Sequence, residues 1–172
     1  MKKILAIILL VVAIIAIAGY AGAADSVTQQ ASVTVSPVIA LSGPATLDFG
    51  TVADSTAGPT TLTVTNTLTD GSNMKIDVYT KANDTKMVNT DPSINDTITP
   101  IQFTTHEGSA TDYTIGYQMA YDNWPKPHQG GSPVTWDEIL TIIVPSYTNN
   151  GTYVVTIYNT AVAHNAVAPT TP

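Results

Sequence analysis

The sequence predicts an all-β fold, an antiparallel β-sandwich of about eight or nine strands that follows an N-terminal hydrophobic signal segment. Three observations support it. After the N-terminal segment, apolar residues recur with period two. Gly, Pro, Asn and Asp interrupt this pattern at short intervals, as turns do. No later segment has a helical period, and lysine and glutamate, which suit helix surfaces, are few. A closed barrel is the alternative architecture.

The N-terminus has the pattern of an export signal. Two lysines precede an uninterrupted apolar run over residues 4–18, and the small residues Ala21 and Ala23 suit signal peptidase. Residues 1–23 are therefore predicted to be a signal peptide. A retained membrane anchor is the alternative, because a helix over residues 4–24 would span about 31 Å. A pilin-type signal is disfavoured, because nothing like a prepilin cleavage site precedes the apolar run.

Charge and cysteine content exclude several functions. Cleavage would leave four of the six lysines and all 13 acids, a net charge of −9, and the chain has no arginine. Such a chain lacks the cations that bind nucleic acid or anionic membranes, so only uncleaved residues 4–24 would contact a membrane. With no cysteine, disulfides and thiolate metal ligands are excluded.

The expected strands share an alternation of apolar with small or polar residues. They cover residues 33–35, 38–41, 47–49, 62–64, 74–78, 101–103, 113–121, 140–144 and 153–157, with a last short strand from Ala161. The clearest is 113–121, where five large residues point one way. Asn149-Asn150-Gly151 is expected to join the last two long strands as a hairpin, because Asn-Gly accepts positive φ. Residues 136–138 are expected to form one short turn.

These elements predict a simple domain organisation. Residues 24–36 form an N-terminal arm, residues 37–163 the β-sandwich domain, and residues 164–172 a C-terminal tail. The arm alternates around Val33 and Val35 and ends before Pro37, so these valines are candidates for a strand donated to a neighbouring copy by β-augmentation. The alternative is that the arm pairs within its own domain as a first strand.

Three Asn-x-Thr triplets are candidate N-glycosylation sites. Asn83, Asn95 and Asn150 each fall in an expected turn or loop, where a glycan can be carried. Chance produces such triplets often in a chain rich in asparagine and threonine. Use of the sites also depends on a host that has the pathway.

Tyr121, Trp124 and Trp136 bracket a stiff loop rich in proline and glycine. Aromatic faces stack on sugar rings, so this loop is the place to look for a carbohydrate ligand. The alternative is that the two tryptophans cap an open end of the fold and hold the loop in place.

No catalytic or metal site is expected. No serine has the G-x-S-x-G context, and His106, His128 and His164 lack the close pairing that zinc sites use. The polar residues near Asn83 and Asn95 do not match a calcium-loop spacing. The sequence therefore predicts a protein without a cofactor that is not an enzyme.

Two short patterns carry a resemblance to a known class. Residues 47–52 (Leu-Asp-Phe-Gly-Thr-Val) followed by 62–66 (Leu-Thr-Val-Thr-Asn) resemble the opening of immunoglobulin-like sandwich modules in bacterial and archaeal surface proteins. Residues 151–157 are similar to the final hairpin of such modules. A looser resemblance is to camelysin-like and archaeal-thread fibre subunits. These resemblances imply a location and an architecture, but no catalytic residue.

The leading interpretation is an extracellular structural or adhesive cell-surface protein, a candidate fibre subunit whose partners are copies of itself or other surface components. A monomeric secreted carbohydrate-binding module that uses the loop at Trp124 and Trp136 is the second hypothesis. A small secreted hydrolase is the third.

Overall fold

The computed structural model describes residues 29–53 and 55–170. All regular structure in these residues is β-strand, without a helix, and all strand pairs are antiparallel, which confirms the predicted class. The chain divides after Val35, and every strand belongs to the unit Ser36–Pro172. The strands are β1 (Leu41–Ser42), β2 (Thr60–Asp70), β3 (Ile76–Ala82), β4 (Met87–Asn89), β5 (Thr97–Ile98), β6 (Ile101–Thr104), β7 (Ala110–Asp112), β8 (Gln118–Trp124), β9 (Val134–Val144), β10 (Tyr153–Val154) and β11 (Ile157–Ala163).

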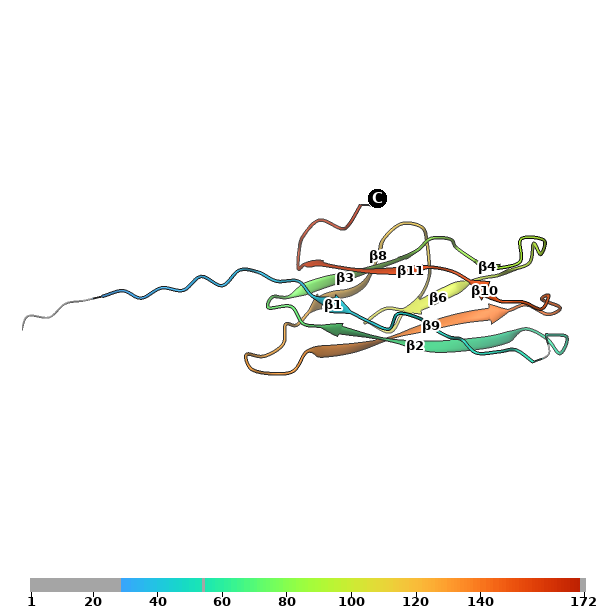
Figure 1. The fold of residues 1–172 in the computed structure, drawn as a ribbon, viewed down its shortest axis with the longest axis horizontal. Helices are drawn as coiled ribbons and strands as arrows, with labels where there is room; N and C mark the ends of the chain where they lie inside the picture. The colour runs from blue at the N-terminus through green and yellow to red at the C-terminus, as the bar shows by residue number, and fades with distance from the viewer. Residues whose placement is uncertain (1–28, 54, 171–172) are drawn as a thin grey trace, which may run out of the picture. The chain divides into compact units, whose positions relative to one another are not determined.

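The largest sheet has five strands in the order β1-β2-β9-β6-β7. Figure 1 labels four of them, β1, β2, β9 and β6. Its centre is the pair of β2 and β9, which runs from Thr60 opposite Val144 to Asp70 opposite Val134. Along β2 the expected alternation is present: Leu62 and Val64 are partly buried, and the threonines that alternate with them, Thr61, Thr63 and Thr65, are exposed. Threonine suits this exposed face because its β-branched side chain is stable in an extended backbone.

Two smaller sheets have three strands each, in the orders β11-β3-β8 and β10-β4-β5. In the first, β3 is the central strand and all seven of its residues are buried. The register between β3 and β8 shifts twice, between Ile76 and Tyr79 on β3. One bulge residue on β8, Asn123, has a φ of 56°, a value that asparagine tolerates better than most residues.

Side chains from all three sheets meet in one main hydrophobic core. Its buried members are Ala82, Met87, Ile98, Ile101, Phe103, Tyr113, Ala120, Leu140, Ile142 and Val144. A second cluster joins Leu68, Ile76, Val78 and Trp124. Burial of these large apolar groups is the main favourable term in folding, at roughly 25 cal/mol per Å² of buried apolar surface.

The expected single strand over residues 113–121 is wrong, because the chain leaves one sheet there and enters another. β7 ends at Asp112 in the five-stranded sheet, and β8 begins at Gln118 beside β3. Between them, the Thr114 amide bonds the Gln118 side chain at 3.0 Å, and Ile115 is 64% exposed. Tyr113 is nevertheless buried. The apolar alternation in the sequence therefore continues through a segment that is not one continuous strand.

The expected hairpin at residues 149–151 is also wrong. β9 pairs with β2 and β6, whereas β10 pairs with β4, so the Asn-Gly segment connects two different sheets. The expected strand 153–157 is divided for the same reason, since β11 pairs with β3. Residues 136–138 lie inside β9 rather than in a turn, and the last strand begins at Ile157 rather than at Ala161.

The predicted signal peptide, residues 1–23, lies outside the described residues. In the part of the chain that is described, no helix is long and apolar enough to cross a membrane. Residues 29–36 belong to no strand, so the alternation around Val33 and Val35 does not form an intramolecular strand A. The expected strand 38–41 is represented by β1 and by bonds of the Val38 and Ala40 carbonyls to the amides of Asn73 and Gly71.

Candidate functional site

Most of the outer edge of β2 has no backbone hydrogen-bond partner among the described residues. β1 pairs with β2 only at Thr69 and Asp70, at one end of the eleven-residue strand. Among the described residues, residues 60–68 make no other backbone bond on the side away from β9. Such an edge presents a row of unpaired amides and carbonyls, to which another extended chain can add.

The segment over residues 43–53 passes over the main core without joining a sheet. Its side chains Leu47, Phe49 and Val52 pack against the core. Within the described residues, no backbone hydrogen bond links this segment to a strand, and the Gly50 amide bonds the Asp48 side chain at 2.8 Å. The segment therefore covers apolar surface without completing the β-ladder.

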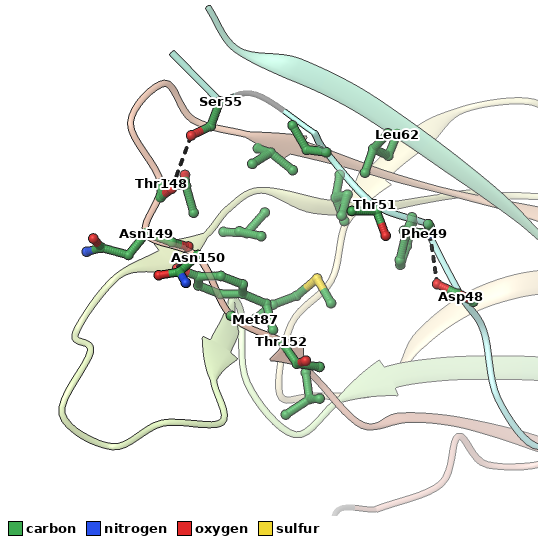
Figure 2. Close-up of a pocket in the computed structure, with 18 of the residues that line it drawn as sticks. Asp48, Phe49, Thr51, Ser55, Leu62, Met87, Thr148, Asn149, Asn150 and Thr152 are labelled. Atoms are coloured by element: carbon green, nitrogen blue, oxygen red, sulfur yellow. Dashed lines mark hydrogen bonds between the residues drawn. The ribbon is translucent and has the colours of Figure 1, made fainter.

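A groove of about 650 Å³ lies beside this segment (Figure 2). Its apolar lining comes from strands of two sheets, together with the 43–53 segment: Leu47, Phe49, Val52, Leu62, Met87, Ile98, Ile142, Val144, Tyr153 and Val154. Polar residues of the 148–152 loop form much of the rest of the lining, and the Ser55 hydroxyl donates to the Thr148 carbonyl at 3.1 Å. An apolar groove with a polar rim suits an amphipathic, extended peptide.

The two donor candidates have highly exposed side chains. Val33 is 88% exposed and Val35 is 75% exposed. Residues 29–35 are in no strand, so the described part of this alternating segment has two exposed valines and no β-ladder of its own. The arm and the outer edge of β2 therefore have complementary properties. The arm is an alternating segment outside any strand, and β2 has an outer edge without a backbone partner over residues 60–68, beside an apolar groove.

The three candidate glycosylation residues, Asn83, Asn95 and Asn150, are all exposed. Asn150 also lines the groove. Its loop is tied to the loop of Asn95, because the Asn149 amide and side chain both bond Asp96, at 2.8 and 2.9 Å. A glycan on Asn150 would therefore stand beside the groove.

The candidate ligand residues Tyr121, Trp124 and Trp136 come together in one aromatic cluster. Tyr121 stacks on Trp124, with ring centroids 4.8 Å apart, and both contact Trp136 edge-on. The His106 ring also stacks on the Tyr121 ring, with centroids 3.8 Å apart. The sequence pattern did not indicate that His106 belongs to this cluster. Trp124 is fully buried, so its ring has no surface for a sugar, and its role is to pack the second core cluster.

A second cluster, unexpected from the sequence, joins Asp77, Asp122 and His164 within 4.8 Å. The His164 Nδ1 lies 2.7 Å from an Asp77 oxygen and 3.7 Å from an Asp122 oxygen. Asp77 also accepts the backbone amides of Asn123, at 2.8 Å, and Asn165, at 3.0 Å. An ionised Asp77 carboxylate only accepts, so the contact at 2.7 Å places a proton on Nδ1.

Asp77 therefore connects the central strand β3 to both of its neighbours, since Asn123 lies on β8 and Asn165 follows β11. Burial of Asp77 would raise its pKa, but the bonds from Asn123, His164 and Asn165 outweigh burial and hold that pKa below its ordinary value. The ionised carboxylate is thus the form that stabilises this part of the fold.

The core also contains a buried carboxyl group. Glu138 is fully buried on β9, where the Asn66 amide donates to it at 2.7 Å and the Tyr113 hydroxyl at 3.4 Å. Thr80 on β3 donates to the same tyrosine oxygen at 3.3 Å, so the chain of bonds joins two sheets. The sequence could have indicated the burial of Glu138, because Glu138 alternates with the apolar residues Leu140 and Ile142 and so lies on the same face of the strand.

No protein-family model matches this chain, and the comparison with curated proteins finds no match either. The fold shows that the chain is an all-β protein with several antiparallel sheets.

Proposed function

We propose that this protein is an exported structural protein of the cell surface, a fibre subunit that assembles by β-strand donation between copies. The observation that carries the proposal is the open edge of β2 beside an apolar groove, in a chain whose alternating arm is in no strand. The domain is proposed to be an immunoglobulin-like sandwich, which agrees with the short patterns at residues 47–52, 62–66 and 151–157.

The length of the arm agrees with the length of the outer edge of β2 that lacks a partner. An extended chain rises about 3.3 Å per residue, so residues 29–36 would reach about 26 Å and the open stretch 60–68 would present about 30 Å. In the arm, Val33 and Val35 would face the groove beside Leu62 and Val64. The polar residues between them would then face solvent, as do the exposed threonines of β2.

Charge and composition support a role outside the cell. The predicted export signal and the net charge of −9 of the predicted mature chain suit a soluble, exported subunit. Stability without disulfides depends on the core described above. A fibre needs self-complementary surfaces and no cofactor, which agrees with a chain in which sequence motifs point to no catalytic group.

The test is electron microscopy of the chain from Ala24 onward at high concentration, compared with the double variant Val33→Ser/Val35→Ser. Ordered fibres of the unsubstituted chain, lost in the double variant, are expected. The matched control is Val167→Ser, because Val167 is 87% exposed and lies outside the arm. A chain that stays monomeric at every concentration while folded, by circular dichroism, would refute the proposal.

A further inference from the structure

On the face of the β11-β3-β8 sheet that points away from the core, the central strand β3 places a lysine among polar and aromatic residues. Along β3, Ile76, Val78 and Ala82 belong to the core clusters, so Asp77, Tyr79 and Lys81 point to the opposite face. On β11, Tyr158 lies directly opposite Lys81 and Thr160 opposite Tyr79.

Lys81 is nearly buried without an anionic partner. Only 8% of the residue is exposed, and its Nζ lies 4.6 Å from the ring centroid of Tyr117 and 5.3 Å from that of Tyr158. Among the described residues, no carboxylate forms an ion pair with Nζ and no acceptor hydrogen-bonds it. The two rings therefore provide the only close electrostatic partners of this ammonium group within the described chain.

An unpaired buried charge is costly, and two tyrosine faces offset only part of that cost. The mature chain contains 13 acids and four lysines, so a carboxylate partner would have been easy to supply from within. None is placed at Lys81. Two acids of this sheet, Asp77 and Asp122, are grouped with His164 at the other end of β3. Within the described chain, the charge of Nζ thus lacks the anionic partner that an external anion would supply.

The surroundings of Lys81 indicate what kind of anion fits. Tyr158, directly opposite Lys81 on β11, is 44% exposed, so an accessible ring borders the lysine. Met119, opposite Tyr79 on β8, adds an apolar side chain that is 43% exposed to the same sheet. The Tyr117 hydroxyl is 3.2 Å from the Thr160 hydroxyl, which orients that ring in advance of binding. Aromatic faces stack on the C–H face of a sugar, and an ammonium pairs with a carboxylate.

We propose that Tyr117, Lys81 and Tyr158 bind a uronic acid residue of an acidic polysaccharide, with the sugar carboxylate at Lys81 Nζ and the sugar ring against tyrosine. The acidic end of the same face, at Asp122, repels a second carboxylate, so the site takes one charged sugar. Because the rest of the mature chain is strongly acidic, affinity depends on this one lysine rather than on a general attraction to polyanions. The site is independent of strand donation.

The test uses the full chain as the cell processes it, titrated with an oligogalacturonate and, separately, with the same oligosaccharide after its carboxylates are reduced to alcohols. Calorimetry should detect binding of the charged oligosaccharide and about tenfold or more weaker binding of the neutral one. Lys81→Met should lose binding to a similar extent, and Tyr158→Ala should weaken it. The matched control, Lys126→Met, removes an exposed lysine and should bind as the unsubstituted chain does.

Two results would overturn the proposal. One is the absence of binding to the charged oligosaccharide, or equal binding by the Lys81→Met variant, which must first be shown by circular dichroism to be folded. The other is self-association that Lys81→Met abolishes while no oligosaccharide binds, because Lys81 would then pair with a carboxylate of a second copy.

Discussion

Asn66 and Glu138 face each other across β2 and β9, and the Asn66 Nδ2 donates a 2.7 Å hydrogen bond to the Glu138 Oε2 in the interior of the protein. The Tyr113 hydroxyl donates to the other carboxyl oxygen at 3.4 Å. Burial raises the pKa of Glu138 to about 7, because these two bonds only partly compensate for lost hydration of the charged form. Folding is therefore coupled to protonation of this one group.

Glu138→Gln should make stability less dependent on pH. The unfolded carboxyl has the ordinary pKa of 4.5, so between about 4.5 and 7 the folded state holds a proton that the unfolded state has released. Stability should fall as pH rises through that range, by up to about 3 kcal/mol at roughly 1.4 kcal/mol per unit. Glutamine stays neutral, so this fall should disappear.

Urea unfolding at pH 5 and pH 8 measures the effect, and the variant should gain stability relative to the unsubstituted chain at pH 8. The control is Glu107→Gln, which changes the other glutamate of the chain, in an exposed loop. If Glu138→Gln and the unsubstituted chain lose the same stability between the two pH values, the buried carboxyl is not the coupled group.

Asp77→Asn should destabilise the β11-β3-β8 sheet. One amide nitrogen would replace an oxygen that accepts backbone amides, leaving a buried donor without an acceptor at a cost of about 1 to 3 kcal/mol. The folded pKa of Asp77 is lowered, so its contribution is complete above the unfolded pKa and is lost as pH falls through the folded pKa.

The difference between the Asp77→Asn variant and the unsubstituted chain should thus be largest near neutral pH and shrink in acid. Urea unfolding near neutral pH and in acid below the ordinary aspartate pKa of 3.8 measures this difference. Asp122→Asn is the matched control, since Asp122 is 59% exposed and belongs to the same cluster. A loss for Asp122→Asn as large as that for Asp77→Asn would contradict the role given to Asp77.

Trp124→Ala distinguishes a core residue from a ligand residue. Trp124 is fully buried in the second core cluster, and truncation of such a side chain costs about 3 to 5 kcal/mol. Chemical denaturation should show that loss. A variant that keeps its stability but loses binding to a neutral glycan panel would instead restore the carbohydrate-binding hypothesis for this loop.

The sequence predicted the class of fold because period-two alternation is a local property. It holds along β2 and β9, where Leu62 faces Ile142 across the sheet. Strand partners are not local. Alternation continues through Tyr113 although the backbone crosses between sheets there, and Asn150-Gly151 has hairpin chemistry although β9 and β10 pair with different strands.

Among the candidate sites too, local features could be predicted from the sequence and contacts between distant residues could not. Exposure of Asn83, Asn95 and Asn150 followed from turn-forming residue types, which favour the surface. The meeting of Asp77 with His164 joins residues 87 positions apart in the chain, so no spacing rule could reveal it. The lysine between Tyr117 and Tyr158 likewise depends on which strands are neighbours.

Strand donation is tested most directly by disulfide trapping, because the chain has no cysteine of its own. Thr34→Cys in the arm is combined in turn with a cysteine at Thr61, Thr63 or Thr65, the exposed positions on the open edge of β2. The control pairs the same arm cysteine with Ala110→Cys on β7, at the opposite edge of the sheet. Directly opposed residues of paired strands lie close enough for a disulfide.

Oxidation of the assembled protein should give a ladder of covalent multimers on a non-reducing gel for at least one β2 pair and none for the Ala110 pair. Reduction should return the ladder to single chains. Fibres that form without any cross-link at β2, or that cross-link equally at Ala110, would contradict donation of the arm to the open edge of β2.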